Sequence, residues 1–137
     1  MESSFAAYAG TPLLKKLGIR AGATVGLLGA PDGFVQLLNP LPEGAVLQQG
    51  LSGPVNVALW FVRWRRELEG SIASLVPVSA RGPLWIAWPK KASGEPTDLV
   101  QQDVREAGLA AGMVDYKICS IDATWSALAF RKRRGRR

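Results

Sequence analysis

The 137-residue sequence contains no histidine and a single cysteine, Cys119. The missing histidine removes the commonest general base near neutral pH, and with it Ser-His-Asp and Cys-His nucleophile pairs. One cysteine allows no intrachain disulfide, and without histidine the usual zinc ligand sets are excluded. Catalysis would depend on Asp, Glu, Lys, Tyr or a bound cofactor, and we expect no metal site. Cys119 lies in the middle of a predicted strand, in the string KICSI, and is expected to be buried.

Long hydrophobic runs are also lacking. The apolar stretches, such as residues 55–62, are too short to cross a bilayer, so no membrane span is predicted. The N-terminus shows no basic segment followed by an apolar one and is not typical of a signal peptide. We therefore expect a cytoplasmic protein. With 47% hydrophobic residues, a chain of this length predicts one domain with a modest core.

The excess of positive charge is confined to one end of the chain. The net charge is +6, and the last seven residues, RKRRGRR, account for the whole excess, so that residues 1–130 are formally neutral. We predict a flexible arm at residues 1–10, one α/β domain at residues 11–130 and a basic disordered tail at residues 131–137. Nucleic acid would be bound through this tail only, by backbone charge, and the alternative is a solvated end. The residues concerned are Arg131, Lys132, Arg133, Arg134, Arg136 and Arg137.

Two runs, residues 55–61 and 84–88, are apolar on both faces, which is typical of central parallel strands. Weaker strands are predicted at residues 24–28 and 46–49, and a hairpin at residues 114–131. Helical spacing is present at residues 64–75 and in a second segment that Thr97 or Asp98 could cap and Gly108 and Gly112 could close. A short helix is also predicted, with Thr11 as its N-cap, Pro12 at its first helical position and Gly18 at its end.

The order strand, helix, strand, helix, strand, hairpin predicts a three-layer Rossmann-like α/β sandwich. Its sheet would be mostly parallel and would end in an antiparallel hairpin. Right-handed crossovers would make residues 55–61 and 84–88 parallel neighbours.

The loop at residues 89–98 follows a buried strand, and ligands of open α/β sheets bind at that end of the strands. Its lysines and hydroxyls, with the N–H groups of the next helix, are typical of an anion site. The alternative is a solvated loop whose polar residues cap a helix. The candidate ligand-binding residues are Asp32, Trp88, Lys90, Lys91, Ser93, Gly94, Thr97 and Asp98.

Asp32 would lie at the carboxyl end of the first strand, in the string Ala-Pro-Asp-Gly. If that strand lies beside residues 84–88, its carboxylate faces the lysines across one crevice, where it could bind a cationic group or act as a base. The alternative is a β-turn residue. Trp88 and Trp125 stand at strand ends, where they could line a pocket or belong to the core.

Four strings resemble a bacterial family known only as domain of unknown function 3052. They are G-T-P-L-x-K-K-L-G-I at residues 10–19, A-P-D-G-F at residues 30–34, W-P-K-K-x-S-G-x-x-T-D-L at residues 88–99, and V-D-x-K-x-C-x-x-D-x-T-W-S-x-L at residues 114–128. The resemblance covers most of the chain and implies a shared fold, but this family brings no established activity with it.

The second half of the chain is also similar to the end of class I methyltransferases, which finish with a strand, a helix and an antiparallel strand pair. The matching segments are residues 84–88, 98–109 and 114–131. The first half departs from that pattern. Residues 26–33 lack the G-x-G spacing that follows the first strand of a methyltransferase. Residues 48–50, at the end of the second predicted strand, include no acidic residue that could bind the ribose of the cofactor. The resemblance is therefore one of topology, and no cofactor is predicted from it.

Three functional hypotheses follow. The leading one is a non-catalytic module that binds an anionic small molecule or a protein partner at residues 89–98. The second is a diverged methyltransferase-like enzyme that uses S-adenosylmethionine. The third is a nucleic-acid-associated protein that binds through the basic tail.

Overall fold

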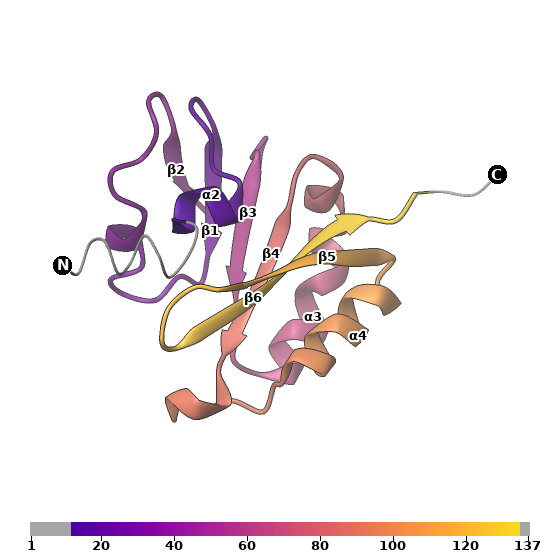
Figure 1. Ribbon diagram of the computed structural model, residues 1–137. Coiled ribbons are helices and arrows are strands. Elements are labelled where there is room, and N and C mark those ends of the chain that lie inside the picture. Colours follow the sequence, from indigo (N-terminus) through magenta and orange to yellow (C-terminus); the bar gives the residue numbers. More distant parts are fainter. Residues whose placement is uncertain (1–11, 135–137) are drawn as a thin grey trace.

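The computed structural model describes residues 12–134 and contains a six-stranded sheet in the order β2-β1-β3-β4-β6-β5 (Figure 1). Neighbours among β2, β1, β3 and β4 are parallel, whereas β6 runs antiparallel to both β4 and β5. The mixed α/β sheet with its antiparallel end is thus as expected. The strands are β1 (Thr24–Leu28), β2 (Val46–Gln49), β3 (Val57–Phe61), β4 (Leu84–Pro89), β5 (Met113–Ser120) and β6 (Trp125–Lys132).

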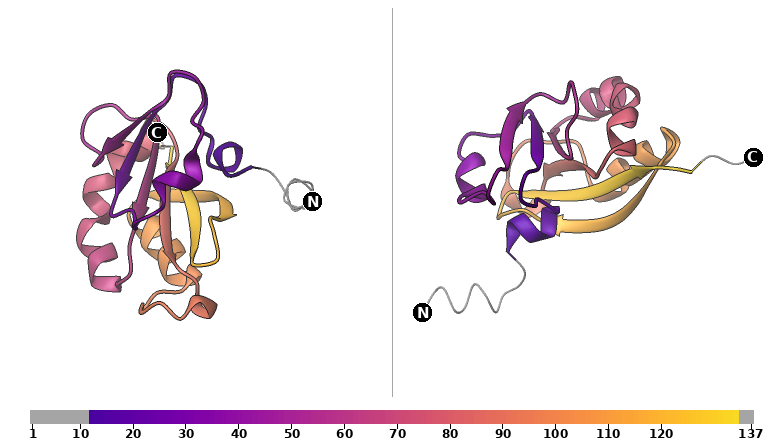
Figure 2. Two further views of the ribbon diagram at one scale, coloured as in Figure 1. Left: turned by 90° about the vertical axis from the view of Figure 1, so that its left-hand side faces the viewer. Right: turned by 90° about the horizontal axis from the view of Figure 1, so that it is seen from above.

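The two faces of the sheet are covered unequally (Figure 2). One face carries α3 (Arg65–Leu75), η2 (Val76–Ala80) and α4 (Gln101–Ala110), and a further turn, η3 (Lys91–Ser93), follows β4. Within residues 12–134, the other face is covered by the short helices α2 (Leu13–Leu17) and η1 (Val35–Leu38). The structure therefore confirms a mixed α/β fold. It does not confirm the predicted three-layer sandwich, because only short helices from the described part of the chain cover the second face.

The two central strands are buried along their whole length, as the apolar runs predict. Leu59 and Phe61 of β3 face α2, whereas Ala58 and Trp60 face α3. β3 pairs with β4 in parallel, with Leu59 opposite Trp85, so the predicted neighbours are confirmed. β3 begins at Val57, two residues later than the run suggested.

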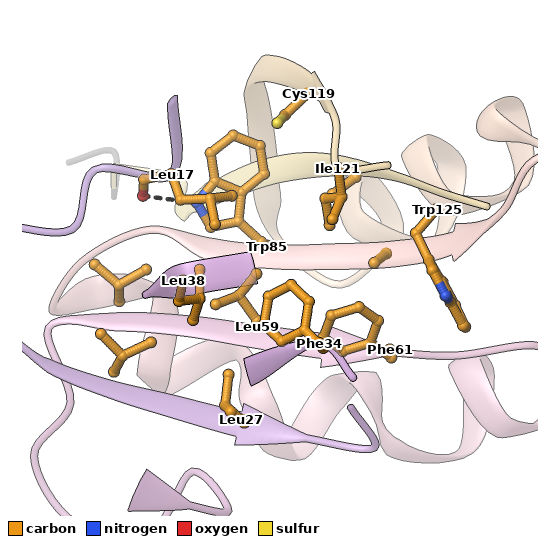
Figure 3. Close-up of a cluster of buried hydrophobic side chains, with 14 of the residues drawn as sticks. Leu17, Leu27, Phe34, Leu38, Leu59, Phe61, Trp85, Cys119, Ile121 and Trp125 are labelled. Carbon is orange, nitrogen blue, oxygen red and sulfur yellow. Dashed lines mark hydrogen bonds between the residues drawn. The ribbon is translucent and has the colours of Figure 1, made fainter. Parts of the chain in front are cut away.

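The core on the α2 face joins segments from the whole chain (Figure 3). The ring of Phe61 meets the rings of Phe34 and Trp125 edge-on, with centroids 4.9 and 5.1 Å apart. The indole N–H of Trp85 donates to the carbonyl oxygen of Leu17 at 3.1 Å, which satisfies the one polar group of a fully buried side chain. This core fixes the loop after β1 and the β5–β6 turn at one end of the sheet.

Two details of the second long helix differ from the prediction. α4 begins at Gln101, and the Asp103 carboxylate accepts the N–H of Val100 at 2.9 Å, so neither Thr97 nor Asp98 caps it. Gly108 lies inside the helix and does not end it. A side chain at this position would collide with the ring of Phe130, so the glycine serves packing. Gly112, with φ +96°, ends the helix as expected.

The predicted limits of the domain also change. Arg131 and Lys132 belong to β6 and pair with Val114 and Met113, so they are not part of a tail. Residues 1–11, with the predicted arm and Thr11, and residues 135–137, with Arg136 and Arg137, lie outside the described residues. Across residues 12–134, no helix combines the length and apolar character needed to cross a membrane.

Candidate functional site

A crevice of about 280 Å³ lies at the carboxyl ends of the parallel strands. The loop after β1 supplies Asp32 and Phe34, and the segment that follows β3 supplies Arg63. Glu95 reaches it from the loop after β4. The β5–β6 turn closes it with Asp122, Thr124 and Trp125. Segments that are far apart in sequence meet here because parallel strands end at the same edge.

The backbone of β1 turns sharply to form one wall of the crevice. Gly29 has φ +74°, and a Cβ placed there would lie 2.8 Å from the carbonyl oxygen of Phe61. A side chain at this position would therefore push β1 and β3 apart. The glycine lets the loop 30–34 fold over the end of β3, which brings Asp32 to the crevice.

The charge of the crevice is negative. Three acidic residues, Asp32, Glu95 and Asp122, line the crevice together with a single guanidinium, that of Arg63. Arg63 is already engaged, because its Nη1 is 2.8 Å from Glu95 Oε1 and its Cζ lies 5.2 Å from the centre of the Trp125 ring. This arrangement favours a cation over an anion.

The carboxylates differ in their roles. Asp122 Oδ1 accepts the N–H groups of Thr124 and Trp125, both at 2.8 Å, and so shapes the β5–β6 turn. Asp32 is exposed, and within residues 12–134 its carboxylate makes no hydrogen bond or ion pair. Asp32 is thus the crevice acid most available to a ligand.

The two predicted lysines do not line this crevice. Lys90 is half-buried and its Nζ donates to Ser120 Oγ at 2.6 Å and to the carbonyl oxygen of Asp122 at 2.7 Å. These bonds tie the end of β4 to the β5–β6 turn. Lys91 is exposed on η3. The structure therefore brings Asp32 to the crevice but does not bring the lysines to Asp32.

The hydroxyls and the acid of the loop 89–98 are engaged in local structure. Ser93 Oγ donates to the Lys90 carbonyl at 2.7 Å and accepts the N–H of Glu95. Thr97 Oγ1 donates to the carbonyl of Arg63 at 2.6 Å, and Asp98 Oδ1 accepts the N–H of Arg65 at 2.7 Å. Asp98 thus satisfies the first N–H of α3, not of α4.

Two further predicted residues have structural positions. Trp88 is 4% exposed and packs in the core on the α3 and α4 face, away from the crevice. Gly94 ends η3 with φ +78°, a conformation in which a side chain would be strained. Neither Trp88 nor Gly94 lines the crevice.

Cys119 is 4% exposed on the α2 face, as expected. Burial raises the pKa of its thiol, which favours the unreactive protonated form near neutral pH. Among residues 12–134, no group of three or more acidic or cysteine side chains is placed to hold a metal ion.

The sequence prediction does not include three of the charged residues that line the crevice, namely Arg63, Glu95 and Asp122. Arg63 closely follows a doubly buried strand, which is the signal that could have identified it. Glu95 and Asp122 lie in loops, and nothing in their neighbouring sequence distinguishes them from other acidic loop residues. Only their approach to Asp32 in space gives the crevice its charge.

Comparison with known proteins gives a likeness of fold alone. No protein-family model matches the chain, and no curated protein matches it. Among solved structures, the chain is similar to LepI in complex with SAM (TM-score 0.50) and to a LepI variant in complex with SAH and a substrate analogue (TM-score 0.51). It is also similar to a structure described as a pericyclic reaction enzyme, with a TM-score of 0.50. All three are 14% identical, and the match covers 92% of this chain but 48% of theirs.

The chain thus spans about half the length of these solved structures. The likeness extends over nearly all of this chain, so the first half shares the fold as well as the second. The predicted resemblance to the family of unknown function 3052 stays a prediction.

Proposed function

We propose that this chain is a methyltransferase-like domain that binds S-adenosylmethionine, or a cation of that class, in the crevice at the carboxyl ends of β1, β3 and β4. The observation that carries the proposal is the charge of the crevice, with three carboxylates against one paired guanidinium. S-adenosylmethionine carries a permanent positive charge on its sulfonium, and S-adenosylhomocysteine does not.

The fold supports this choice of ligand. The structures to which the chain is similar include LepI complexes described as holding SAM and SAH. The crevice of about 280 Å³ is slightly smaller than the usual small-molecule site of roughly 300–1,000 Å³, so it fits the sulfonium part of such a ligand better than the whole of it. Asp32 would face the charge, and Phe34 and Trp125 would form the apolar wall.

The hypothesis of an anionic ligand at the loop 89–98 has less support. Lys90 is bonded to the β5–β6 turn, and the nearby crevice carries negative charge. Lys91 is exposed on the same loop, but it does not line the crevice.

The experiment compares the two ligands by calorimetry at low and physiological salt. We expect S-adenosylmethionine to bind more tightly than S-adenosylhomocysteine, and the difference to shrink as salt is added. Asp32→Asn should weaken binding of the charged ligand by up to about five-fold, since an exposed ion pair contributes roughly 1 kcal/mol or less. Its affinity for the neutral ligand should change little.

Glu106→Gln is the matched control, because it removes one negative charge from an exposed position on α4, away from the crevice. It should leave both affinities unchanged. No binding of either ligand at millimolar concentration would overturn the proposal. Equal affinity for the two ligands, unaffected by Asp32→Asn, would show that the crevice charge does not select the ligand.

A further inference from the structure

The opposite end of the sheet has a different character. A hollow of about 520 Å³ lies at the amino ends of β1, β3 and β4. Arg20, just before β1, and Arg81, just before β4, stand on its rim, and the remaining lining residues are neutral. Both arginines are exposed, and neither forms an ion pair with any residue in the range 12–134.

The basic end of β6 lies beside this hollow. Because β6 is antiparallel to β4, with Phe130 opposite Leu84, the chain after Phe130 runs toward the amino end of β4 (Figure 1). Arg131 therefore comes level with Pro83, which lines the hollow. η2, which leads into Arg81, also packs against β6.

Arg131 and the hollow lie on the same face of the sheet. Phe130 packs on the α4 face, so the side chain of the next residue, Arg131, points to the α2 face. Val57, which lines the hollow, also faces α2. Arg131, Arg133 and Arg134 line a second hollow, of about 440 Å³, together with Val114. We call Arg20, Arg81, Arg131, Arg133 and Arg134 the amino-end basic face.

The two ends of the sheet thus differ in charge. Three acids and Arg63 line the crevice at the carboxyl ends of the strands. At the amino ends, Arg20 and Arg81 come from the formally neutral residues 1–130, and Arg131, Arg133 and Arg134 come from the basic segment that follows. From β1 to β6 the sheet crosses three strand spacings, or about 14 Å. This is close to the rise of four base pairs, at about 3.4 Å each.

We propose that the amino-end basic face binds the phosphate backbone of a nucleic acid. The arginines are exposed and spread out, as suits a polyanion rather than a small enclosed ligand. Neither hollow is lined by an aromatic side chain from residues 12–134. The face therefore contacts phosphates and does not read base sequence. This binding site includes the folded body, through Arg20 and Arg81, as well as Arg131, Arg133 and Arg134.

One acid moderates the face. The carbonyl oxygen of Glu43 accepts the N–H of Gly22 at 2.8 Å, so Glu43 lies beside the hollow. Its carboxylate opposes the approach of phosphate. Removing the charge of Glu43 should therefore strengthen binding of the nucleic acid, whereas removing the charge of an arginine of this face should weaken it.

The test measures fluorescence anisotropy of a labelled 16-base-pair duplex with the full chain, between 50 and 200 mM salt. The double variant Arg20→Gln, Arg81→Gln should lower the slope of log K against log salt by about 2, and should weaken binding at 50 mM salt by roughly a hundred-fold. Glu43→Gln should strengthen binding. The matched control is Arg66→Gln with Lys91→Gln, which removes two exposed positive charges from positions outside both hollows.

Several outcomes would overturn the proposal. Failure of the duplex to bind, while pyrophosphate or ATP shifts the melting temperature, would make this a small-ligand site. Equal losses in the double variant and in the control would mean that net charge alone attracts the duplex. Unchanged binding in the Arg20, Arg81 variant, with loss in Arg131→Gln, Arg133→Gln, would return the site to the C-terminal segment alone. Circular dichroism of each variant excludes unfolding as the cause.

Discussion

At the scale of single residues, Gly108 shows how a missing side chain can be required for packing. It lies inside α4, where glycine disfavours the helix, yet a Cβ there would overlap the ring of Phe130 at Cε2. Phe130 is fully buried in β6 and cannot move aside without disturbing the core. Gly108→Ala should therefore lower the free energy of unfolding by about 1–3 kcal/mol in urea denaturation.

Gly70 provides the control for this prediction. It also lies inside a helix, α3, but a Cβ there would meet nothing within 4 Å. Gly70→Ala should raise the free energy of unfolding by about 0.5–1 kcal/mol, because alanine is the better helix former. If both substitutions changed the free energy of unfolding in the same direction, the result would contradict the role assigned to Phe130.

At the scale of elements, the start of α4 depends on Asp103. Its carboxylate accepts the N–H of Val100 at 2.9 Å and lies 2.6 Å from Arg65 Nη2 on α3. The bond to the Val100 N–H, aided by Arg65, holds the pKa of Asp103 below its usual value. Asp103→Ala should lower the free energy of unfolding at pH 7 by about 1 kcal/mol.

The pH dependence follows from the direction of that pKa. Because the folded pKa lies below the value of 3.8 taken for the unfolded chain, this stabilisation is present above that pH. It is lost as the pH falls through the folded pKa, so wild type and Asp103→Ala should converge in acid. Glu106→Ala, on the exposed side of the same helix, should show a difference below about 0.5 kcal/mol at every pH. A gap that stays constant into acid would assign the effect of Asp103 to packing instead.

At the scale of the whole molecule, the two proposed sites lie at opposite ends of the sheet. The six residues of β4 separate them by roughly 20 Å at about 3.3 Å per residue, which is more than the ~8 Å screening length in physiological salt. Saturation of the crevice with S-adenosylmethionine should therefore leave duplex affinity unchanged within about two-fold at 150 mM salt. The same anisotropy titration measures this.

The salt concentration tests whether the two sites bind independently. At 10 mM salt the screening length rises to about 30 Å, so the bound cation should then strengthen duplex binding measurably. A ten-fold change that persists at 150 mM salt would show that the two ends are coupled through the structure and not through screened charge.

Much of the fold could be predicted because its signals are local. The doubly apolar runs identified β3 and β4, and the left-handed Gly18 and Gly112 ended their helices as expected. The capping of α4 could not be predicted in the same way. Asp98 is three residues before Gln101 in sequence, but in space it lies against Arg65, so it serves α3.

The candidate site was predicted only in part, for a related reason. Position at the end of a strand predicts Asp32, which lines the crevice. The same rule predicts Lys90, but its long side chain extends to Ser120 and the Asp122 carbonyl, thirty and thirty-two residues away. A side chain's partners across the sheet are not encoded in its neighbours along the chain.

The sequence by itself determined the alternation of strands and helices, the doubly covered centre of the sheet and the absence of histidine chemistry. These follow from hydrophobic spacing and composition, which depend on each residue and its near neighbours. The tertiary structure alone decided where charge collects. Strand pairing brings Asp32 and Glu95 to one crevice at the carboxyl ends of the strands, and Arg20 and Arg81 to one hollow at the amino ends, across long stretches of chain.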